Sequence, residues 1–364
     1  MSLPPLISVV MAALDGEKYL EEALGSILGQ SFRDFEFIII NDGSTDNTAS
    51  ILQRYADLDA RLRPFHQRNR GVTAALNMGC RVARGKYIAR MDADDIACPD
   101  RFERQVDFLE RHPAVAVLGG AIELINGKGA PIRRVRFPVE DRQIKEILPP
   151  GNCFSHPSIM MRKDAFDAMG GYRMPFLHAE EYDLWLRMAE CYDLANLPDV
   201  LLYYRIHARQ VTARHLRQQV VSDLAAKATA RIRRATGQDP PLPAPGVNAD
   251  SLATLAVSRD RLTDTLIDRY LGYADLMAAA GEYAAAAQLL RESLTVSRTK
   301  AARGRIAEIH VECARGQYQD RNPTGALLSL ARAAAVRPTL APTFIRYAWR
   351  AFRKFGARAV HPAV

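Results

Sequence analysis

Two periods of hydrophobic residues alternate along the first hundred positions of the chain. Short apolar runs bounded by turn residues predict buried strands, and apolar residues three and four positions apart predict helices. The expected strands cover residues 6–11, 35–41, 62–66 and 86–91. The expected helices cover residues 17–30, 48–56, 72–83 and 99–111. Strands that alternate with helices predict an α/β fold with a mostly parallel sheet.

The pattern is less regular after His112. Residues 127–138 predict a hairpin or loop, and residues 149–173 mix turn residues with one apolar strand and one short helix. A compact helix over residues 180–190 and a strand over residues 200–207 follow. We expect these segments to complete the domain that the first hundred residues begin.

A change of composition marks the expected domain boundary. Residues 236–248 are rich in Pro and Gly and cannot continue a helix. Beyond them the chain is rich in Ala, Leu and Arg, and its apolar positions recur with a helical period. The predicted parts are an N-terminal domain at 1–215, a linker at 216–250 and a helical C-terminal domain at 251–364.

Two segments of the helical region resemble each other. Residues 281–290 and 326–338 are similar to helical hairpins of the tetratricopeptide type. Their separation is longer than the repeat of about 34 residues that this type requires. An irregular helical bundle is therefore an equal alternative to a repeat array.

Composition and charge narrow the class of protein. The 364 residues carry a net charge of +8, with 27 Lys and Arg against 29 Asp and Glu up to residue 215, and 22 against 12 beyond it. No apolar stretch reaches the roughly 18 to 20 residues of a membrane-spanning helix, and no signal peptide is recognisable, so we expect a cytoplasmic protein. The five scattered cysteines form no C-x-x-C pair that would indicate a zinc site or a redox motif, and we expect them to be reduced.

Acidic residues follow three of the predicted strands. They lie in 12-AALDGE-17, 41-NDGSTD-46 and 92-DADD-95. Turn and helix-cap geometry would explain each segment taken alone, because Gly43 permits unusual dihedral angles and Asp side chains accept from exposed helix amides. In an open α/β sheet, however, ligands bind beyond the carboxyl ends of the strands. We therefore treat these acids as candidates for a binding site.

The charge in 92-DADD-95 needs compensation. Three carboxylates within four residues repel one another, and at least one would be protonated unless a cation or hydrogen-bond donors stabilise them. Mg²⁺ or Mn²⁺ takes one or two protein carboxylates and completes its shell with water and phosphate oxygens. This segment therefore indicates a divalent metal that binds together with a diphosphate.

Five segments in order resemble family 2 glycosyltransferases, which are inverting enzymes with the GT-A fold. The segments are 8-SVVMAALDGEKYLEEALGSILGQSF-32, 38-IIINDGSTDNT-48, 68-RNRGVTAALNMG-79, 86-KYIARMDADD-95 and 180-EEYDLWLR-187. The resemblance covers about residues 5–210 and does not extend to the helical region.

The resemblance implies a set of residues around a nucleotide-sugar donor. Asp42 would face the base, and Asp92 and Asp94 correspond to the D-x-D motif, whose second acid holds the metal that bridges the diphosphate. Asp95 would lie close to the donor sugar. The remaining residues expected near the nucleotide-sugar are Ala12, Leu14, Glu17, Arg70, Asn77 and Ala93.

The resemblance also implies a catalytic base at the start of residues 180–190. Inverting transfer needs one carboxylate to remove the proton of the acceptor hydroxyl. The family usually has Glu-Asp here, with Asp as the base, whereas this chain has Glu180 and Glu181. Glu181 is therefore the expected base, one methylene longer than usual, and Asp183 is the second candidate. An acidic helix N-terminus without catalysis is the structural alternative.

Three further features are candidates for the site. His207 follows Tyr-Arg where family members often have His, and is a candidate metal ligand, although a lone His is more often structural. His156, Gly170 and Gly171 lie with Glu180 where the acceptor or sugar edge is usually built.

The end of the chain is basic and aromatic. In 346-RYAWRAFRKFGAR-358, Arg and Lys alternate with Trp and Phe, which suits a helix on an anionic membrane surface. A solvated helix end with its aromatic residues in the core is the alternative. No nucleic-acid-binding motif accompanies the charge, and the helical region is a candidate contact for a protein partner or a second copy.

The sequence therefore predicts an inverting, metal-dependent glycosyltransferase. Its expected donor is a nucleotide-sugar, most simply a UDP-sugar, with Mn²⁺ or Mg²⁺ as cofactor. Its expected acceptor is a hydroxyl of a glycan or lipid-linked precursor in surface polysaccharide synthesis. The alternative is a catalytically weakened scaffold that binds sugar nucleotides or glycans. A nucleotidyltransferase is less favoured, because no Gly-rich phosphate loop follows the first strand.

Overall fold

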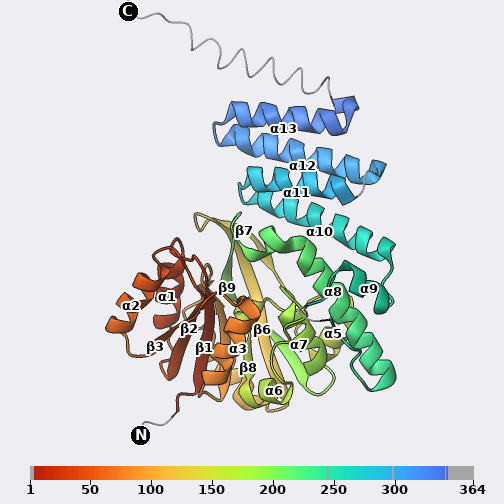
Figure 1. The fold of residues 1–364 in the computed structure, drawn as a ribbon. Coiled ribbons are helices and arrows are strands. Elements are labelled where there is room, and N and C mark those ends of the chain that lie inside the picture. Colours follow the sequence, from red (N-terminus) through yellow and green to blue (C-terminus); the bar gives the residue numbers. More distant parts are fainter. Residues whose placement is uncertain (1–3, 244–245, 297–298, 341, 343–364) are drawn as a thin grey trace, which may run out of the picture. The chain divides into compact units, whose positions relative to one another are not determined.

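The computed structural model of the chain describes residues 4–243, 246–296, 299–340 and 342 (Figure 1). Contacts divide the chain into two units. The first unit contains Met1–Arg205 and Val221–Val257, and the second contains Ile206–Val220 and Ser258–Val364. This division differs from the boundary expected at residue 215, because the chain returns to the first unit after Val220.

One mixed sheet forms the centre of the first unit. Its strand order is β3-β2-β1-β4-β8-β6-β9-β5, and β7 pairs with β6. The strands are β1 (Ile7–Ala13), β2 (Phe35–Asn41), β3 (Leu62–His66), β4 (Tyr87–Asp92), β5 (Ile96–Ala97), β6 (Val115–Asn126), β7 (Pro131–Val135), β8 (Met160–Arg162) and β9 (Asp193–Ile206). Strands β1 to β4 pair in parallel, whereas β8 pairs antiparallel with β4 and β6. The expected α/β class is confirmed, with an antiparallel second half.

Helices connect the parallel strands in the expected order. Helices α1, α2 and α3 separate β1 to β4, and α4 follows the short strand β5. The later helices of this part are shorter. The helices up to β9 are α1 (Leu20–Leu28), α2 (Thr48–Leu58), α3 (Val72–Val82), α4 (Arg101–Arg111), α5 (Asp141–Ile147), α6 (Lys163–Ala168) and α7 (Glu180–Met188), with a 3-10 turn at His156–Ser158.

Strand β6 was not expected from the sequence. It is buried along nearly its whole length, so its residues show no alternation of polar and apolar positions. Gly119 and Gly120 interrupt the apolar run, and a Cβ atom at Gly120 would lie 2.5 Å from Leu201 Cδ1 of β9. These glycines allow β9 to lie close to β6, which is a tertiary requirement that periodicity does not reveal.

The linker expected over residues 216–250 is largely a helix. Helix α8 (Val211–Thr236) passes from the second unit into the first, with a non-helical residue at His215. The described residues between 237 and 248 are non-helical, because this stretch is rich in Pro and Gly. Helix α9 (Ala249–Thr254) then ends the part of the chain that belongs to the first unit.

The second unit contains two helical hairpins. They consist of α10 (Arg259–Ala279) with α11 (Tyr283–Val296), and α12 (Lys300–Gln319) with α13 (Pro323–Val336), followed by a 3-10 turn at Pro338–Leu340. The turns contain Gly281 and Arg321, both at positive φ. An all-helical C-terminal region is confirmed, and its tetratricopeptide likeness stays a prediction.

Two further expectations concern membranes. Among the helices that the structure describes, none combines the length and the apolar character needed to cross a bilayer. The basic segment 346–358 lies outside the described residues.

Candidate functional site at the carboxyl ends of the parallel strands

The carboxyl ends of β1, β2 and β4 meet at one edge of the sheet. Ala12 of β1 is in register with Asp92 of β4 and with Ile40 of β2. The turns that follow are also joined, because the Thr45 backbone N–H donates to Asp15 Oδ1 at 2.8 Å. The acidic residues that follow these strands therefore lie along one edge of the sheet, where an open α/β sheet binds its ligands.

Leu14 and Glu17 lie in the turn after β1. Leu14 is 49% exposed, so this apolar side chain is available to a ligand at the edge. Glu17 Oε2 accepts from Asn47 Nδ2 at 2.7 Å and from the Asn47 backbone N–H at 3.2 Å. Glu17 therefore joins the turns after β1 and β2, and its contact with a nucleotide stays a prediction.

Asp42 organises the loop that enters α3. Its buried carboxylate accepts from Gln67 Nε2 at 2.7 Å, from the Arg70 backbone N–H at 2.9 Å and from the Gly71 backbone N–H at 2.8 Å. Gly71 adopts a φ of 86°, which favours glycine. The Arg70 side chain is exposed. The structure thus gives Asp42 a loop-shaping role, and its predicted contact with the base remains untested.

Asn77 holds the loop that contains Gly170 and Gly171. Its Nδ2 donates to the Tyr172 carbonyl at 2.8 Å, and its Oδ1 accepts from the Tyr172 backbone N–H at 3.0 Å. Both glycines have a φ of 74°, and a Cβ atom at Gly171 would lie 2.9 Å from Asn77 Oδ1. The amide and the glycines therefore fix Tyr172, and Asn77 has this structural use beside its predicted one.

Asp92, Asp94 and Asp95 form a cluster after β4, with Ala93 between the first two. One carboxylate oxygen from each lies within 4.8 Å of the others. Asp95 is 1% exposed, and its Oδ2 has no hydrogen-bond partner among the described residues. Burial and the two neighbouring carboxylates raise the pKa of Asp95 well above its ordinary value. Asp95 therefore has a buried carboxylate whose ionised form is disfavoured by its surroundings.

Arg90 is a buried cation beside this cluster. It lies on β4 two residues before Asp92 and forms an ion pair with it. Although burial opposes it, the Asp92 carboxylate raises the pKa of Arg90, so the guanidinium is charged. Its Nε has no hydrogen-bond partner among the described side chains and backbone. One arginine thus offsets part of a larger negative charge.

Arg205 of β9 holds the backbone of the acidic loop. Its backbone N–H donates to Asp95 Oδ1 at 2.8 Å, and its Nε donates to the Asp94 carbonyl at 2.8 Å. It also forms an ion pair with Glu22 of α1, and its guanidinium lies 4.4 Å from the centroid of the Tyr19 ring. Arg205 therefore determines the conformation of Asp94 and Asp95.

A second acidic group lies at the start of α7. Ligand atoms of Glu180, Glu181 and His156 are within 4.8 Å of one another. Burial, with the Glu180 and Asp223 carboxylates, raises the pKa of Glu181 well above its ordinary value. Burial and the charge of Arg90 lower the pKa of His156, so its ring is neutral. A carboxylate with a raised pKa is suited to accept a proton.

His156 is oriented by an aromatic neighbour. Its Nε2 lies 2.8 Å from the Tyr172 hydroxyl oxygen. Tyr172 is the residue fixed by Asn77, so α3 indirectly sets the position of His156. The structure brings together Glu180, His156 and the loop that contains Gly170 and Gly171, and their role at the acceptor or sugar edge stays a prediction.

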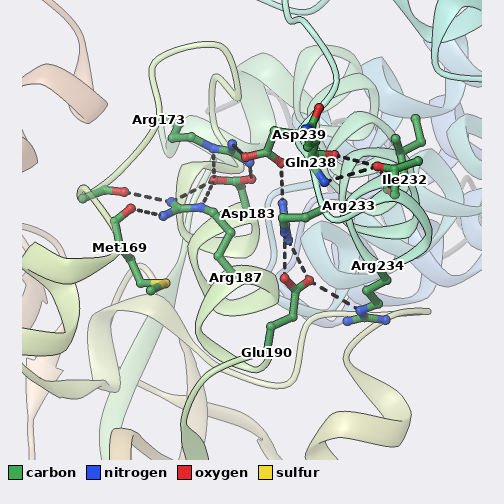
Figure 2. A network of polar contacts seen from close by, with 12 residues as sticks. Met169, Arg173, Asp183, Arg187, Glu190, Ile232, Arg233, Arg234, Gln238 and Asp239 are labelled. Carbon is green, nitrogen blue, oxygen red and sulfur yellow. Dashed lines mark hydrogen bonds and ion pairs between the residues drawn. The ribbon is translucent and has the colours of Figure 1, made fainter.

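Asp183 lies in a network of ion pairs (Figure 2). Its carboxylate is buried and forms ion pairs with Arg173 and Arg187. Arg173 Nε donates to Asp183 Oδ2 at 2.8 Å, and Arg187 Nε donates to the same oxygen at 2.9 Å. Two arginines contact this carboxylate, and both of its oxygens are occupied. These contacts favour Glu181 over Asp183 as the base.

His207 lies in the second unit of the chain. Its backbone N–H donates to Gln210 Oε1 at 2.8 Å, and the Arg209 backbone N–H donates to His207 Nδ1 at 3.3 Å. These contacts shape the turn before α8. Its assignment as a metal ligand stays a prediction.

The donor atoms of the acidic cluster fit a divalent cation. Carboxylate oxygens are the ligands that Mg²⁺ and Mn²⁺ prefer, and Mg²⁺ needs only one or two of them from the protein. Asp95 Oδ2 is buried without a hydrogen-bond partner among the described residues. A cation would relieve both the repulsion and this unsatisfied oxygen.

The N-terminal unit matches a known family model. The model is described as "Glycosyl transferase family 2" and aligns with residues 8–170. Among curated proteins, the O-antigen biosynthesis glycosyltransferase WbnJ of Escherichia coli is 38% identical over 206 residues, which cover 56% of this chain and 80% of that protein. The chain belongs to glycosyltransferase family 2.

Other relatives agree with this assignment. The amylovoran biosynthesis glycosyltransferase AmsE of Erwinia amylovora is 33% identical over 213 residues, covering 57% of this glycosyltransferase and 79% of the relative. The predicted family and enzyme class are thus confirmed. The match of the family model ends at residue 170 and so does not include Glu181.

Two solved structures resemble the chain weakly. One is the mannosyltransferase PcManGT from Pyrobaculum calidifontis in complex with GDP-Man and Mn²⁺, with a TM-score of 0.49 and 16% identity over 91% of this chain and 88% of that one. The other is S. aureus TarS 1–349 in complex with UDP, with a TM-score of 0.46 and 16% identity over 86% and 91%. Likeness of this degree carries no information on donor or metal.

Sequence reasoning did not select Arg90 or Arg205 as site residues. Each is a charged residue inside a predicted strand, namely 86–91 and 200–207. A charged side chain in a buried strand needs a partner, and this was the available signal. The identity of the partners depends on the sheet order, which places β4 and β9 around the acidic loop.

Proposed function

We propose that this glycosyltransferase catalyses inverting, metal-dependent transfer from a nucleotide-sugar, preferentially a UDP-sugar, to a hydroxyl of a glycan or lipid-linked acceptor. One observation carries the proposal: two groups of incompletely neutralised carboxylates, at the end of β4 and at the start of α7, both interact electrostatically with Arg90. The names of the relatives, O-antigen and amylovoran biosynthesis, support a role in surface polysaccharide synthesis.

The acidic loop would bind the donor. Asp94 and Asp92 would hold Mn²⁺ or Mg²⁺, with His207 as a further ligand. Bound there, the cation would stabilise negative charge on the diphosphate leaving group. Arg205 keeps the loop backbone in place through Asp94 and Asp95. Asp42 and the exposed Leu14 lie at the edge where the nucleoside would bind.

The start of α7 would supply the base. Glu181 accepts the proton of the acceptor hydroxyl as that oxygen attacks the anomeric carbon, and the bond from that carbon to the nucleoside diphosphate breaks. One displacement inverts the anomeric configuration. Burial, together with the Glu180 and Asp223 carboxylates, raises the pKa of Glu181 and makes it more basic than an ordinary carboxylate. Asp183, already paired with two arginines, keeps α7 in position.

The direct test measures donor binding and product stereochemistry. Calorimetry would screen UDP, GDP and their common sugar conjugates with Mn²⁺ or Mg²⁺. We expect metal-dependent binding of one nucleotide class, weakened about 10- to 100-fold by Asp94→Asn because a metal ligand is lost. Asp107→Asn is the matched control, since Asp107 lies on the exposed face of α4 in an ion pair with Arg111.

Two results would oppose the proposal. The donor site is refuted if no nucleotide binds to the wild-type protein under any metal condition. The inverting mechanism is refuted if NMR of the product shows the anomeric configuration of the donor. Binding without turnover over an acceptor panel, unchanged by Glu181→Gln, would instead support the scaffold alternative, which the Glu180-Glu181 pair suggests.

A further inference from the structure

A network of ion pairs joins helix α7 to the segment of the first unit beyond residue 220 (Figure 2). The segment includes the second half of α8 and the start of the non-helical stretch that follows it. Neither lies within the part that the family model matches, which ends at residue 170. The network is therefore a feature of this chain that the family assignment does not explain.

The network begins in the first turn of α7. Asp183 is paired with Arg173, which lies in the loop before the helix, and with Arg187 one turn later. Arg187 NH2 also donates to the Gly171 carbonyl at 2.8 Å. The first turn, which carries Glu181, is thus fixed to the Gly170–Gly171 loop.

Asp239 extends the network to α8. Its Oδ2 lies 2.7 Å from Arg173 NH1, and its Oδ1 lies 2.7 Å from Arg233 NH1. One carboxylate therefore bridges an arginine beside the first turn of α7 and an arginine of α8. Both contacts are charge-assisted hydrogen bonds, so one carboxylate restrains two arginine side chains.

Arg233 returns the network to the other end of α7. Its Nε donates to Glu190 Oε2 at 2.7 Å, and its NH2 donates to Glu190 Oε1 at 2.9 Å. Glu190 follows the last residue of α7, Met188, by two positions. Both ends of the helix are thus connected through Arg233 and Asp239.

Other contacts support the same side of α7. Lys227 Nζ of α8 donates to the Pro150 carbonyl at 2.8 Å and lies 5.5 Å from the centroid of the Tyr182 ring. The Val247 backbone N–H donates to the Pro175 carbonyl at 3.0 Å. Lys227 and Val247 therefore contact α7, the loop before it at Pro175 and the loop that follows α5 at Pro150.

We propose that Arg233 and Asp239 are positioning residues, which hold α7 so that Glu181 is aimed at the acceptor hydroxyl. The proposal rests on the proposed function of Glu181. Glutamate has one more rotatable bond than aspartate, so its carboxylate samples more positions for a given backbone. Because a displacement of about 1 Å can lower a rate by about 100-fold, a fixed helix is of particular value to this base.

The proposal is tested with full-length variants. Asp239→Asn removes the charge that bridges Arg173 and Arg233, and Arg233→Met removes the connection to Glu190. Arg234→Met is the matched control, because Arg234 is the adjacent arginine of α8 and its ion pair with Glu190 is a longer contact of 3.5 Å. Asp239→Glu is the conservative variant, which keeps the carboxylate.

We expect a separation of kcat from donor binding. Asp239→Asn and Arg233→Met should lower kcat by about 10-fold or more, with donor KM and calorimetric Kd within about twofold of wild type. Arg234→Met should retain wild-type kcat, and Asp239→Glu should recover part of the loss. A thermal unfolding curve for each variant would give the fraction that is folded at the assay temperature.

Other outcomes would overturn the proposal. It is wrong if Asp239→Asn and Arg233→Met have the kcat of Arg234→Met, or if kcat falls only in proportion to the folded fraction. A wild-type protein that neither binds nor turns over any nucleotide-sugar would instead refute the proposed function. The two failures are thus distinguishable by the wild-type measurement.

Discussion

Buried carboxylates at the two ends of the parallel strands differ in how many hydrogen-bond and ion-pair partners they have. At the amino ends, Glu36 of β2 is buried and fully engaged: it accepts from Ser8 Oγ at 2.7 Å and from the Arg84 backbone N–H at 2.9 Å, and it pairs with Arg63 and Arg84. These donors outweigh its burial and lower its pKa. At the carboxyl ends, Asp95 and Glu180 each retain a buried oxygen with no partner among the described residues.

The difference distinguishes acids that stabilise the fold from acids for which we propose a role in binding or catalysis. A buried acid surrounded by donors stabilises the fold in its ionised form, whereas a buried acid beside other acids is costly unless a ligand compensates it. Asp183 belongs with Glu36 by this criterion, although it lies two residues from Glu181. Partners, and not sequence position, therefore assign the roles within 180-EEYDLWLR-187.

The largest expected effect is on transfer by Glu181→Gln. Because the amide cannot accept the acceptor proton, kcat should fall by about 10²- to 10⁴-fold, while metal-dependent donor binding is retained. Steady-state kinetics and calorimetry measure the two quantities. Glu181→Asp is the control and should keep substantial activity, since it preserves the carboxylate. Equal activity of Glu181→Gln and wild type would exclude Glu181 as the base.

Removal of the buried cation should have the next largest effect. Arg90→Met leaves Asp92, Glu180 and Glu181 without their shared positive neighbour, so their pKa values rise further and kcat at pH 7 should fall by about 10-fold or more. Arg90→Lys retains the charge and should lose less. Kinetics over a range of pH would measure the change, and identical losses in the two variants would show that packing, not charge, matters.

Loss of the Glu36 carboxylate, at the amino ends of the parallel strands, should lower stability without changing transfer. Glu36→Gln removes an ionised partner of Arg63 and Arg84 and should lower the free energy of unfolding by about 1 to 3 kcal/mol at pH 7. Transfer kinetics at a temperature where the variant is folded should be unchanged. Denaturant unfolding measures the loss, and an unchanged stability would contradict the structural assignment.

The same acid predicts a pH dependence of stability. The pKa of Glu36 is lower in the folded chain than its ordinary value of 4.5, so its contribution is present above that value and is lost as the pH falls through the folded pKa. The stability difference between wild type and Glu36→Gln should therefore shrink below about pH 4.5. Unfolding at pH 7 and pH 4 would show whether it does.

The smallest expected effect is a shift of the pH profile. Glu181 must be ionised to act as a base, so kcat should rise with pH through its raised pKa. Asp223→Asn removes a neighbouring negative charge, which lowers that pKa and moves the rising limb to lower pH. The pH profile of kcat measures the shift. If the rising limb moved to higher pH or did not move, Asp223 would not raise the pKa of the base.

Much of the sheet was predictable because local patterns determine it. The alternation of strands and helices up to residue 111 is visible in the periods of apolar residues, and the export of Asp42 and Asp92 from strand ends follows from the turn sequences. Strand β6 was not predictable, because a strand buried along both faces has no alternation and Gly119 and Gly120 interrupt it. Composition predicts a linker over residues 216–250, whereas residues 211–236 form helix α8.

By itself, the sequence determined the family, the strand ends and the identity of the acidic residues, since these depend on local order along the chain. The tertiary structure decided which acids are neutralised. It placed Arg173 and Arg187 on Asp183, and Ser8 and Arg84 on Glu36. The physical reason is that the electrostatic state of a buried carboxylate depends on the charges and donors around it in space, which come from distant parts of the chain.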